Sequence, residues 1–249
     1  MVHGWESVES LPLLGEDEVH IWRIELPDAG TPPEEYFHRL TAEEQARAER
    51  MRAGVVRLQF VVARACLRTL LGHTAGLDPT AVAITQTSFG KPETVGMFFN
   101  VAHSGAAILI ALCRSRSVGI DIEYFSREVD ALEIAKNSFS SNEFLALSSI
   151  SDSDSLRRSF FRCWTRKEAV IKADGRGLSL PLDSFEVPVG DVSRATEVLI
   201  SESGKQPVGH YFVCDVPYGD DVAAAVAIAA PRGHAHGFFF PLSMVPRKR

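Results

Sequence analysis

Two acidic residues at alternate positions end a short apolar run of this chain. The run begins at Val118 and continues through Ile120, Asp121 and Ile122 to Glu123. In a strand, side chains two residues apart share a face, so Asp121 and Glu123 point one way while the isoleucines point into the core. The two carboxylates therefore converge. The alternative is the solvated outer face of an ordinary strand.

Glu168 and Lys172 form a second group of charged residues, four positions apart in a run with helical character. Side chains at this spacing share one face of a helix, and Trp164 lies one turn earlier on the same stripe. Taken alone, the pair is typical of an exposed ion pair, which contributes about 0.3–0.5 kcal/mol. Longer motifs decide between an ion pair and a functional site.

Several longer motifs contain or surround these residues. They are Gly119-Ile-Asp-Ile-Glu123, Trp164 to Lys172, Gly175 to Phe185, Phe89-Gly-Lys-Pro92 and Asn100-Val-Ala-His-Ser-Gly105. Together they resemble the motifs of the 4′-phosphopantetheinyl transferases, specifically of the Sfp-type branch. The resemblance extends over residues 40 to 190, and the two ends of the chain match only in layout.

The resemblance implies a reaction in which the 4′-phosphopantetheine arm of coenzyme A moves to a serine of a carrier protein, releasing 3′,5′-ADP. It also implies that Asp121, Glu123 and Glu168 hold one Mg²⁺ together with the pyrophosphate of coenzyme A. Magnesium prefers a near-octahedral shell of hard oxygen ligands, which carboxylates and phosphate supply. Such a transfer depends mainly on positioning and charge neutralisation.

The same resemblance assigns catalytic roles to Asp121, Glu168 and Lys172. Glu168 is the expected general base for the carrier serine, directly or through a water. A bound cation lowers the pKa of a carboxylate, so a metal-bound water is the alternative base. Lys172 is expected to neutralise charge on the pyrophosphate. Lys167 points about 100° away from Glu168 around the helix and is a weaker candidate.

Further residues are implied as contacts of coenzyme A. They are His103, Lys91, Lys172, Arg47 and Ser104. His103 matches a histidine that contacts a phosphate, and its alternative role is an ordinary turn histidine. Relatives commonly have serine before this histidine, whereas this chain has Ala102. One hydroxyl contact is therefore expected to be missing, at a cost of about 0.5–1.5 kcal/mol.

The order of elements suggests that a similar unit occurs twice. Thr41 to Glu44 and Ser140 to Glu143 both read as capping boxes at the start of helices, and strand-like runs follow each helical region. We therefore expect an α+β fold, and the resemblance implies an internal pseudo-dimer with the active site between its halves. The expected division is 1–119 and 120–232 for the two α+β halves and 233–249 for a C-terminal tail across the surface.

The helical and strand patterns place boundaries within each half. A first helical pattern runs from Val55 to a stop at Gly72, and a second covers Arg158 to Ala173. Strands are predicted over Ala81–Thr85, Met97–Val101, Ala106–Cys113, Val118–Ile122, Leu182–Val187, Glu197–Ser201, His210–Val216 and Val222–Ala230.

Composition limits the classes of protein. The 249 residues are 45% hydrophobic and 23% charged, with a net charge of −6, which argues against binding nucleic acid through overall positive charge. No apolar run approaches the ~20 residues of a membrane helix, and no secretory signal is visible, so a cytoplasmic protein is expected. We also expect a monomer. Four widely spaced cysteines are predicted to be reduced core residues.

The expected protein partner is an acyl or peptidyl carrier domain, typically small, helical and acidic. We expect it to dock on a basic patch beside the cleft, with Phe161 and four arginines as candidates: Arg157, Arg158, Arg162 and Arg166. Two alternatives stay open: another Mg²⁺-dependent phosphoester enzyme, and a non-catalytic module that binds carrier proteins or coenzyme A. The sequence does not specify which fatty acid, polyketide or peptide pathway the carrier serves.

Overall fold

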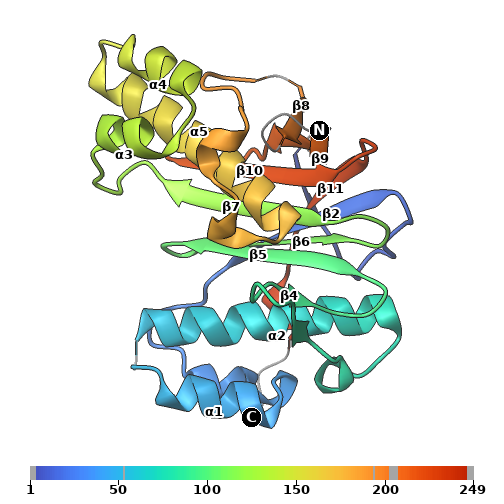
Figure 1. Ribbon diagram of the computed structural model, residues 1–249. Helices are drawn as coiled ribbons and strands as arrows, with labels where there is room; N and C mark the ends of the chain where they lie inside the picture. The colour runs from blue at the N-terminus through green and yellow to red at the C-terminus, as the bar shows by residue number, and fades with distance from the viewer. Residues whose placement is uncertain (1–3, 53, 193, 202–206, 246–249) are drawn as a thin grey trace.

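Two β-sheets lie between two long helices, so the chain folds in four layers (Figure 1). The computed structural model describes residues 4–52, 54–192, 194–201 and 207–245. Helix α2 (Val55–Ala75) covers one sheet and helix α5 (Ser153–Asp174) covers the other. The mixture of helices and mostly antiparallel strands confirms the predicted α+β class.

The first sheet has five strands in the order β1-β11-β2-β6-β5, and the two β11 pairings are parallel. These strands are β1 (Trp5–Ser7), β2 (Glu18–Glu25), β5 (Phe98–Ser104), β6 (Ala107–Cys113) and β11 (His234–Phe239). The segment 233–249, expected as a surface tail, thus contributes a strand between β1 and β2, while residues 246–249 lie outside the described residues. A small hairpin of β3 (Thr85–Gln86) and β4 (Pro92–Glu93) precedes β5.

Helix α1 (Ala42–Arg50) begins at the predicted capping box, in which Thr41 and Glu44 bond reciprocally. Helix α2 does not stop at Gly72, as the sequence suggested, but continues to the left-handed Gly76, where φ is 68°. Gly72 is needed inside the helix because a Cβ there would lie 2.8 Å from the carbonyl oxygen of Leu77. The glycine reflects close packing at this position instead of a helix end.

The second sheet is antiparallel in the order β7-β10-β9-β8. Its strands are β7 (Val118–Tyr124), β8 (Thr196–Ser201), β9 (Pro207–Asp215) and β10 (Val222–Ala229). Helices α3 (Ala131–Ser138) and α4 (Ser141–Ser148) precede α5, and the predicted capping box of Ser140 and Glu143 opens α4. The strand predicted at Leu182–Val187 is wrong. This segment starts with a 3-10 turn, and the carbonyl oxygen of Phe185 accepts a hydrogen bond from Lys167 of α5.

Short 3-10 turns complete the described elements. They are η1 (Pro33–Arg39), η2 (Pro79–Ala81), η3 (Gly177–Ser179), η4 (Leu182–Ser184) and η5 (Leu242–Met244). No helix within the described ranges is both long and apolar enough to cross a bilayer. The four cysteines are free thiols and Cys66, Cys113 and Cys163 are buried, as the sequence predicted.

The two sheets share an apolar interface that positions the acidic strand. Ile120 and Ile122 of β7 pack there with side chains of the first sheet such as Leu109. On its other side β7 touches α5 directly, because a Cβ at Gly119 would lie 2.1 Å from the carbonyl oxygen of Ala169. The glycine therefore permits the close approach that brings Asp121 next to the last turns of α5.

Candidate active site

Asp121 lies in the middle of β7, with only 9% of its side chain exposed. Lys172 Nζ donates to Asp121 Oδ1 at 2.6 Å and to the carbonyl oxygen of Ile120 at 3.2 Å. The other carboxylate oxygen, Oδ2, is buried and has no hydrogen-bond partner among the described residues. Burial raises the pKa of Asp121 to about 6, against the opposing effect of Lys172. This carboxylate therefore retains one oxygen for a further ligand.

Glu123 lies two residues further along β7, on the same face, as the alternation predicts. Its Oε2 accepts a hydrogen bond from Ser104 Oγ at 2.9 Å, and its Oε1 accepts one from Arg127 at 2.6 Å. The Ser104 hydroxyl also accepts from the backbone N–H of Tyr124. Ser104, expected to contact coenzyme A, is thus placed where it orients Glu123. Arg127 was not predicted from the sequence, where its position four residues after Glu123 is the available signal.

Glu168 projects from α5 toward the same region and is partly buried. Burial raises the pKa of Glu168, Lys172 opposes the rise, and the charge of Glu123 adds to it. Asp121 in turn experiences the charges of both Glu168 and Glu123. The three predicted acidic residues thus lie within electrostatic reach of one another. Trp164 packs instead with Phe139 and Phe160.

The donor chemistry of this group suits a hard cation. Among the described residues, no set of three or more His, Cys, Asp or Glu side chains is already arranged around a common metal position. The carboxylates of Asp121 and Glu123 are instead paired with Lys172 and Arg127. The buried, unpartnered Oδ2 of Asp121 is nevertheless the kind of oxygen that Mg²⁺ prefers, so the residues present fit such an ion.

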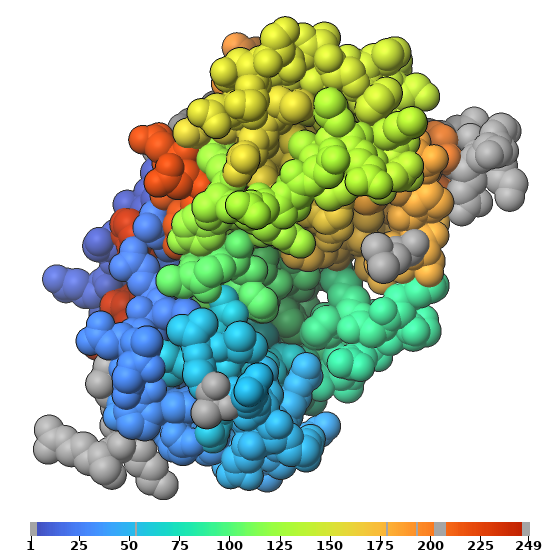
Figure 2. All heavy atoms as spheres, turned by 90° about the vertical axis from the view of Figure 1, so that its left-hand side faces the viewer, coloured from blue at the N-terminus to red at the C-terminus, as the bar shows by residue number. Residues whose placement is uncertain are grey.

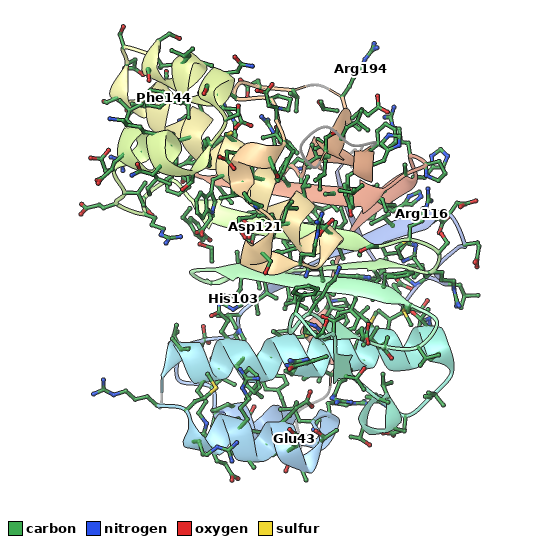
Figure 3. The ribbon with its side chains drawn as sticks, in the orientation of Figure 1. Glu43, His103, Arg116, Asp121, Phe144 and Arg194 are labelled. Atoms are coloured by element: carbon green, nitrogen blue, oxygen red, sulfur yellow. The ribbon has the colours of Figure 1, made fainter. Side chains whose placement is uncertain are left out.

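A cavity of about 350 Å³ lies between α2 and β5, and His103, which lines it, is within electrostatic reach of Glu123 and Lys172. In Figure 3, Asp121 lies beside α5 and His103 lies between β5 and α2. The cavity is lined by His103, Arg47, Arg64 and Phe60. Figure 2 shows the surface hollowed where the cyan, teal and green segments of the first half meet. We call this cavity the front pocket.

The front pocket carries positive charge on an aromatic support. The guanidinium carbons of Arg47 and Arg64 lie 5.0 Å and 5.9 Å from the centre of the Phe60 ring. Desolvation, followed by the charge of Lys172, lowers the pKa of His103. Arg64 was not among the residues expected from the sequence to contact coenzyme A. Its position one turn after Phe60 was the available signal.

Lys91 is placed differently from the other residues expected to contact coenzyme A. Its Nζ donates to Ser117 Oγ and to the carbonyl oxygen of Ala173, both at 3.1 Å. The side chain lines a second cavity of about 550 Å³, which we call the rear pocket. Pro92 lines both pockets, so the β3–β4 hairpin separates them. Burial lowers the pKa of Lys91 to about 8, with Asp174 opposing this effect.

The predicted basic docking patch is wrong at two positions. Phe161 and Arg166 are buried, and Arg166 forms a two-pronged ion pair with Asp215. Their helical face packs onto the second sheet, where the sequence pattern suggested solvent. The remaining arginines also have partners, since Arg162 pairs with Asp191 and Arg158 stacks over Phe125, and Arg157 donates to the carbonyl oxygen of Phe125.

Ala102 faces the apolar interface between the sheets and is only 4% exposed. It does not belong to the lining of the front pocket, whereas His103, the next residue of the strand, does. The alternation of side chains along β5 explains this difference. The missing hydroxyl contact expected from the sequence therefore does not apply to this pocket.

The chain is similar to known proteins both over one segment and over most of its length. A sequence model of the 4′-phosphopantetheinyl transferase superfamily matches residues 117–227, which include β7 and α5. The similarity to a protein of Nostoc sp., 4′-phosphopantetheinyl transferase HetI, is 32% identity over 234 residues. That alignment covers 91% of this chain and 94% of the Nostoc protein.

Other relatives match over a shorter range. The 4′-phosphopantetheinyl transferase Sfp of Bacillus subtilis is 37% identical over 124 residues, covering 49% of this chain and 54% of that protein. The 4′-phosphopantetheinyl transferase gsp of Aneurinibacillus migulanus is 34% identical over 146 residues, covering 58% and 59% respectively. The whole-length similarity to the Nostoc protein thus extends beyond the segment that the superfamily model matches.

Proposed function

Because the chain belongs to the 4′-phosphopantetheinyl transferase superfamily, we propose that it transfers the 4′-phosphopantetheine arm of coenzyme A to a serine of an apo carrier protein. The other product is 3′,5′-ADP. The observation that carries this proposal is the buried Asp121–Lys172 pair, with its unpartnered Oδ2, beside a cationic pocket. Such a site joins a place for a hard cation to a place for a nucleotide phosphate.

Magnesium dependence forms part of the proposal. Asp121, Glu123 and Glu168 would hold the ion, since they are the acidic side chains within reach of one another on β7 and α5. When bound, Mg²⁺ supplies charge neutralisation to the phosphoryl oxygens. Ser104 keeps Glu123 oriented through its 2.9 Å hydrogen bond, so this ligand is partly ordered in advance.

The side chains of α5 would handle the charge and the proton of the reaction. The Lys172 ammonium, held against Asp121 and the backbone of Ile120, would neutralise negative charge on the departing diphosphate oxygen. Glu168 would accept the proton of the carrier serine, directly or through a water, and a metal-bound water is the alternative base; without a cation, burial and the charge of Glu123 raise the pKa of Glu168. Both side chains are four residues apart on one helix face, which fixes their relative positions.

The front pocket would bind the nucleotide of coenzyme A. Arg47 and Arg64 offer guanidinium groups suited to phosphate, and His103 lies between them and the acidic group. The aromatic ring of Phe60 supports both arginines and restricts their motion. We propose that these side chains, with Lys172, form the phosphate contacts of the substrate.

We further propose an acidic, helical acyl or peptidyl carrier domain as the protein partner. Arg157 and Arg158, on the exposed start of α5, are the remaining basic candidates for docking. A cytoplasmic monomer is proposed because the described cysteines are unpaired thiols and the candidate site residues on β5, β7 and α5 all belong to one chain. The division into halves 1–119 and 120–232 is likewise a proposal, with β7 beginning at Val118.

The test is to incubate the full chain with coenzyme A, Mg²⁺ and an apo carrier domain, and then to weigh the carrier. The expected result is a gain of one phosphopantetheine that disappears when Mg²⁺ is chelated. Binding of the carrier without a mass change would identify a non-catalytic module. Breakdown of coenzyme A without any carrier would identify another phosphoester enzyme. Either of these results would reject the proposed transfer.

A further inference from the structure

Lys91 links the β3–β4 hairpin to the end of α5. Its Nζ donates to the carbonyl oxygen of Ala173, in the last turn of α5, and to Ser117 Oγ, just before β7. Ser117 Oγ also donates to the carbonyl oxygen of Ala173. The three groups therefore form one connected network between the hairpin, the helix and the acidic strand.

The position of Gly175 shows how closely the Lys91 chain is enclosed. Gly175 caps α5 in a left-handed conformation, with φ of 92°. A Cβ at this position would lie 3.1 Å from Lys91 Cδ, so a larger residue would press on the lysine stem. An ammonium near the C-terminus of a helix is also favoured by the partial negative charge of the last carbonyl groups.

The surroundings of Lys91 differ from those of a phosphate ligand. The Lys91 side chain lines the rear pocket with Asp174, which is held by Arg176 and by the Tyr211 hydroxyl at 3.0 Å. The adjacent Pro92 lines both pockets, the rear one with Lys91 and the front one with Arg47 and His103. Pro92 therefore forms part of the wall of the front pocket, and Lys91 anchors the same hairpin to the end of α5.

We propose that Lys91 is a positioning residue that ties the β3–β4 hairpin to α5 and so sets the wall of the front pocket, without touching coenzyme A. The proposal rests on the proposed function in that the front pocket binds coenzyme A. Its role depends on the two acceptors at Ser117 and Ala173, of which Ala173 belongs to the second half of the chain. Loss of this tie would loosen Pro92 and weaken nucleotide binding indirectly.

The first experiment measures thermal unfolding without any ligand. The variants are Lys91→Met, Ser117→Ala and the double variant, with Lys136→Met on the exposed face of α3 as a matched control. We expect both single variants to lower the melting temperature and the double variant to lose less than the sum of the two single losses, because both act on one network. Fully additive losses, or no loss in either single variant, would overturn the proposal.

The second experiment measures calorimetric binding of coenzyme A at several salt concentrations. Lys91→Met should weaken binding about tenfold, as expected for lost charged hydrogen bonds, and leave the salt dependence of binding unchanged. Arg64→Gln is the comparison, since loss of a direct phosphate contact should reduce the salt dependence. Ser117→Ala should weaken binding in the same direction as Lys91→Met.

Two outcomes of the binding experiment oppose the proposal. A reduced salt dependence in Lys91→Met, matching that of Arg64→Gln, would show a direct phosphate contact. Unchanged binding in both Lys91→Met and Ser117→Ala would show that the tie does not shape the pocket. Absence of coenzyme A binding by the unmodified protein would reject the proposed function instead, and the ligand-free unfolding data would still decide whether the tie exists.

Discussion

Helix α5 carries two lysines, each paired with a carboxylate, and the two pairs differ in how completely they are closed. Lys167 lies 2.8 Å from Glu143, with side chains 0% and 3% exposed. Lys172 lies 2.6 Å from Asp121, with side chains 28% and 9% exposed. The two lysines are five residues apart, so they leave the helix on different faces. The Lys167–Glu143 pair is buried in the core and is called the closed pair, whereas the Lys172–Asp121 pair is partly exposed and is called the open pair.

The closed pair has every polar group satisfied. Lys167 also donates to the carbonyl oxygens of Leu182 and Phe185, at 2.7 Å and 2.8 Å, and Glu143 accepts from the backbone N–H groups of Ser140 and Val187. The open pair leaves Asp121 Oδ2 without a hydrogen-bond partner in the part of the chain that the structure describes. A saturated pair can only hold structure together, whereas an unsaturated pair retains capacity for a ligand. The two pairs therefore predict opposite responses to mutation.

The largest effect on transfer is expected from removing a carboxylate of the open pair or of its neighbour Glu168. Asp121→Ala and Glu168→Ala should each reduce phosphopantetheine transfer at least about a thousandfold, because each removes a carboxylate that the reaction needs. The free energy of unfolding should change little in Asp121→Ala, since the buried carboxylate is itself unfavourable. Carrier mass and denaturant unfolding measure the two quantities. Normal turnover in either variant would exclude that residue from the site.

Mutation of the closed pair should lower the free energy of unfolding. Lys167→Met would leave the charge of Glu143 in the core without its ionic partner, and we expect a loss of about 3–5 kcal/mol in the free energy of unfolding. Urea denaturation measures this loss, with the exposed Lys136→Met as control. Transfer per folded molecule should stay close to that of the unmodified chain. A stable variant without activity would place Lys167 in the chemistry and contradict the comparison.

The sequence predicted the α+β class, and it singled out Asp121 and Lys172, although it paired Lys172 with Glu168 and gave Glu143 only a capping role. Alternation in Gly119 to Glu123 placed two carboxylates on one face, and two capping boxes marked helix starts correctly. Local patterns failed where distant segments decide the environment. Arg166 looked exposed on its helix but meets Asp215 of β9. Strand β2 and the parallel strand β11 depend on pairing across more than two hundred residues.

The same limit applies to the candidate site. Nothing in the residues near Lys91 indicates that its ammonium bonds to the end of α5, because Ala173 is 82 positions away in the chain. Likewise, Gly72 looked like a helix end in the sequence, but it lies inside α2. A glycine is needed there because of the close approach of the Leu77 carbonyl oxygen, which the helical pattern alone does not show. Contacts between distant segments are therefore the part of the candidate site that local sequence patterns do not show.

A smaller effect is expected at the edge of the open pair. His103→Ala should raise the KM for coenzyme A about tenfold with little change in kcat, because His103 lines the front pocket and not the interior of the acidic group. Steady-state kinetics at varied coenzyme A, with a fixed excess of carrier, measure both constants. An equal fall in kcat would instead place His103 among the groups that stabilise the transition state.

The smallest effect, and the sharpest contrast between the sequence and the structure, is expected at Ala102. If a serine hydroxyl here contacted coenzyme A, Ala102→Ser would lower the KM for coenzyme A. The side chain instead faces the apolar interface of the two sheets, away from the front pocket. We therefore expect an unchanged KM and a loss of about 1 kcal/mol in the free energy of unfolding, from burying a hydroxyl among apolar neighbours. Kinetics and urea denaturation on the same preparation measure both, with Ser104→Ala as the neighbour on the same face that does reach the acidic group. A lower KM in Ala102→Ser would show that β5 turns this face toward the nucleotide during binding.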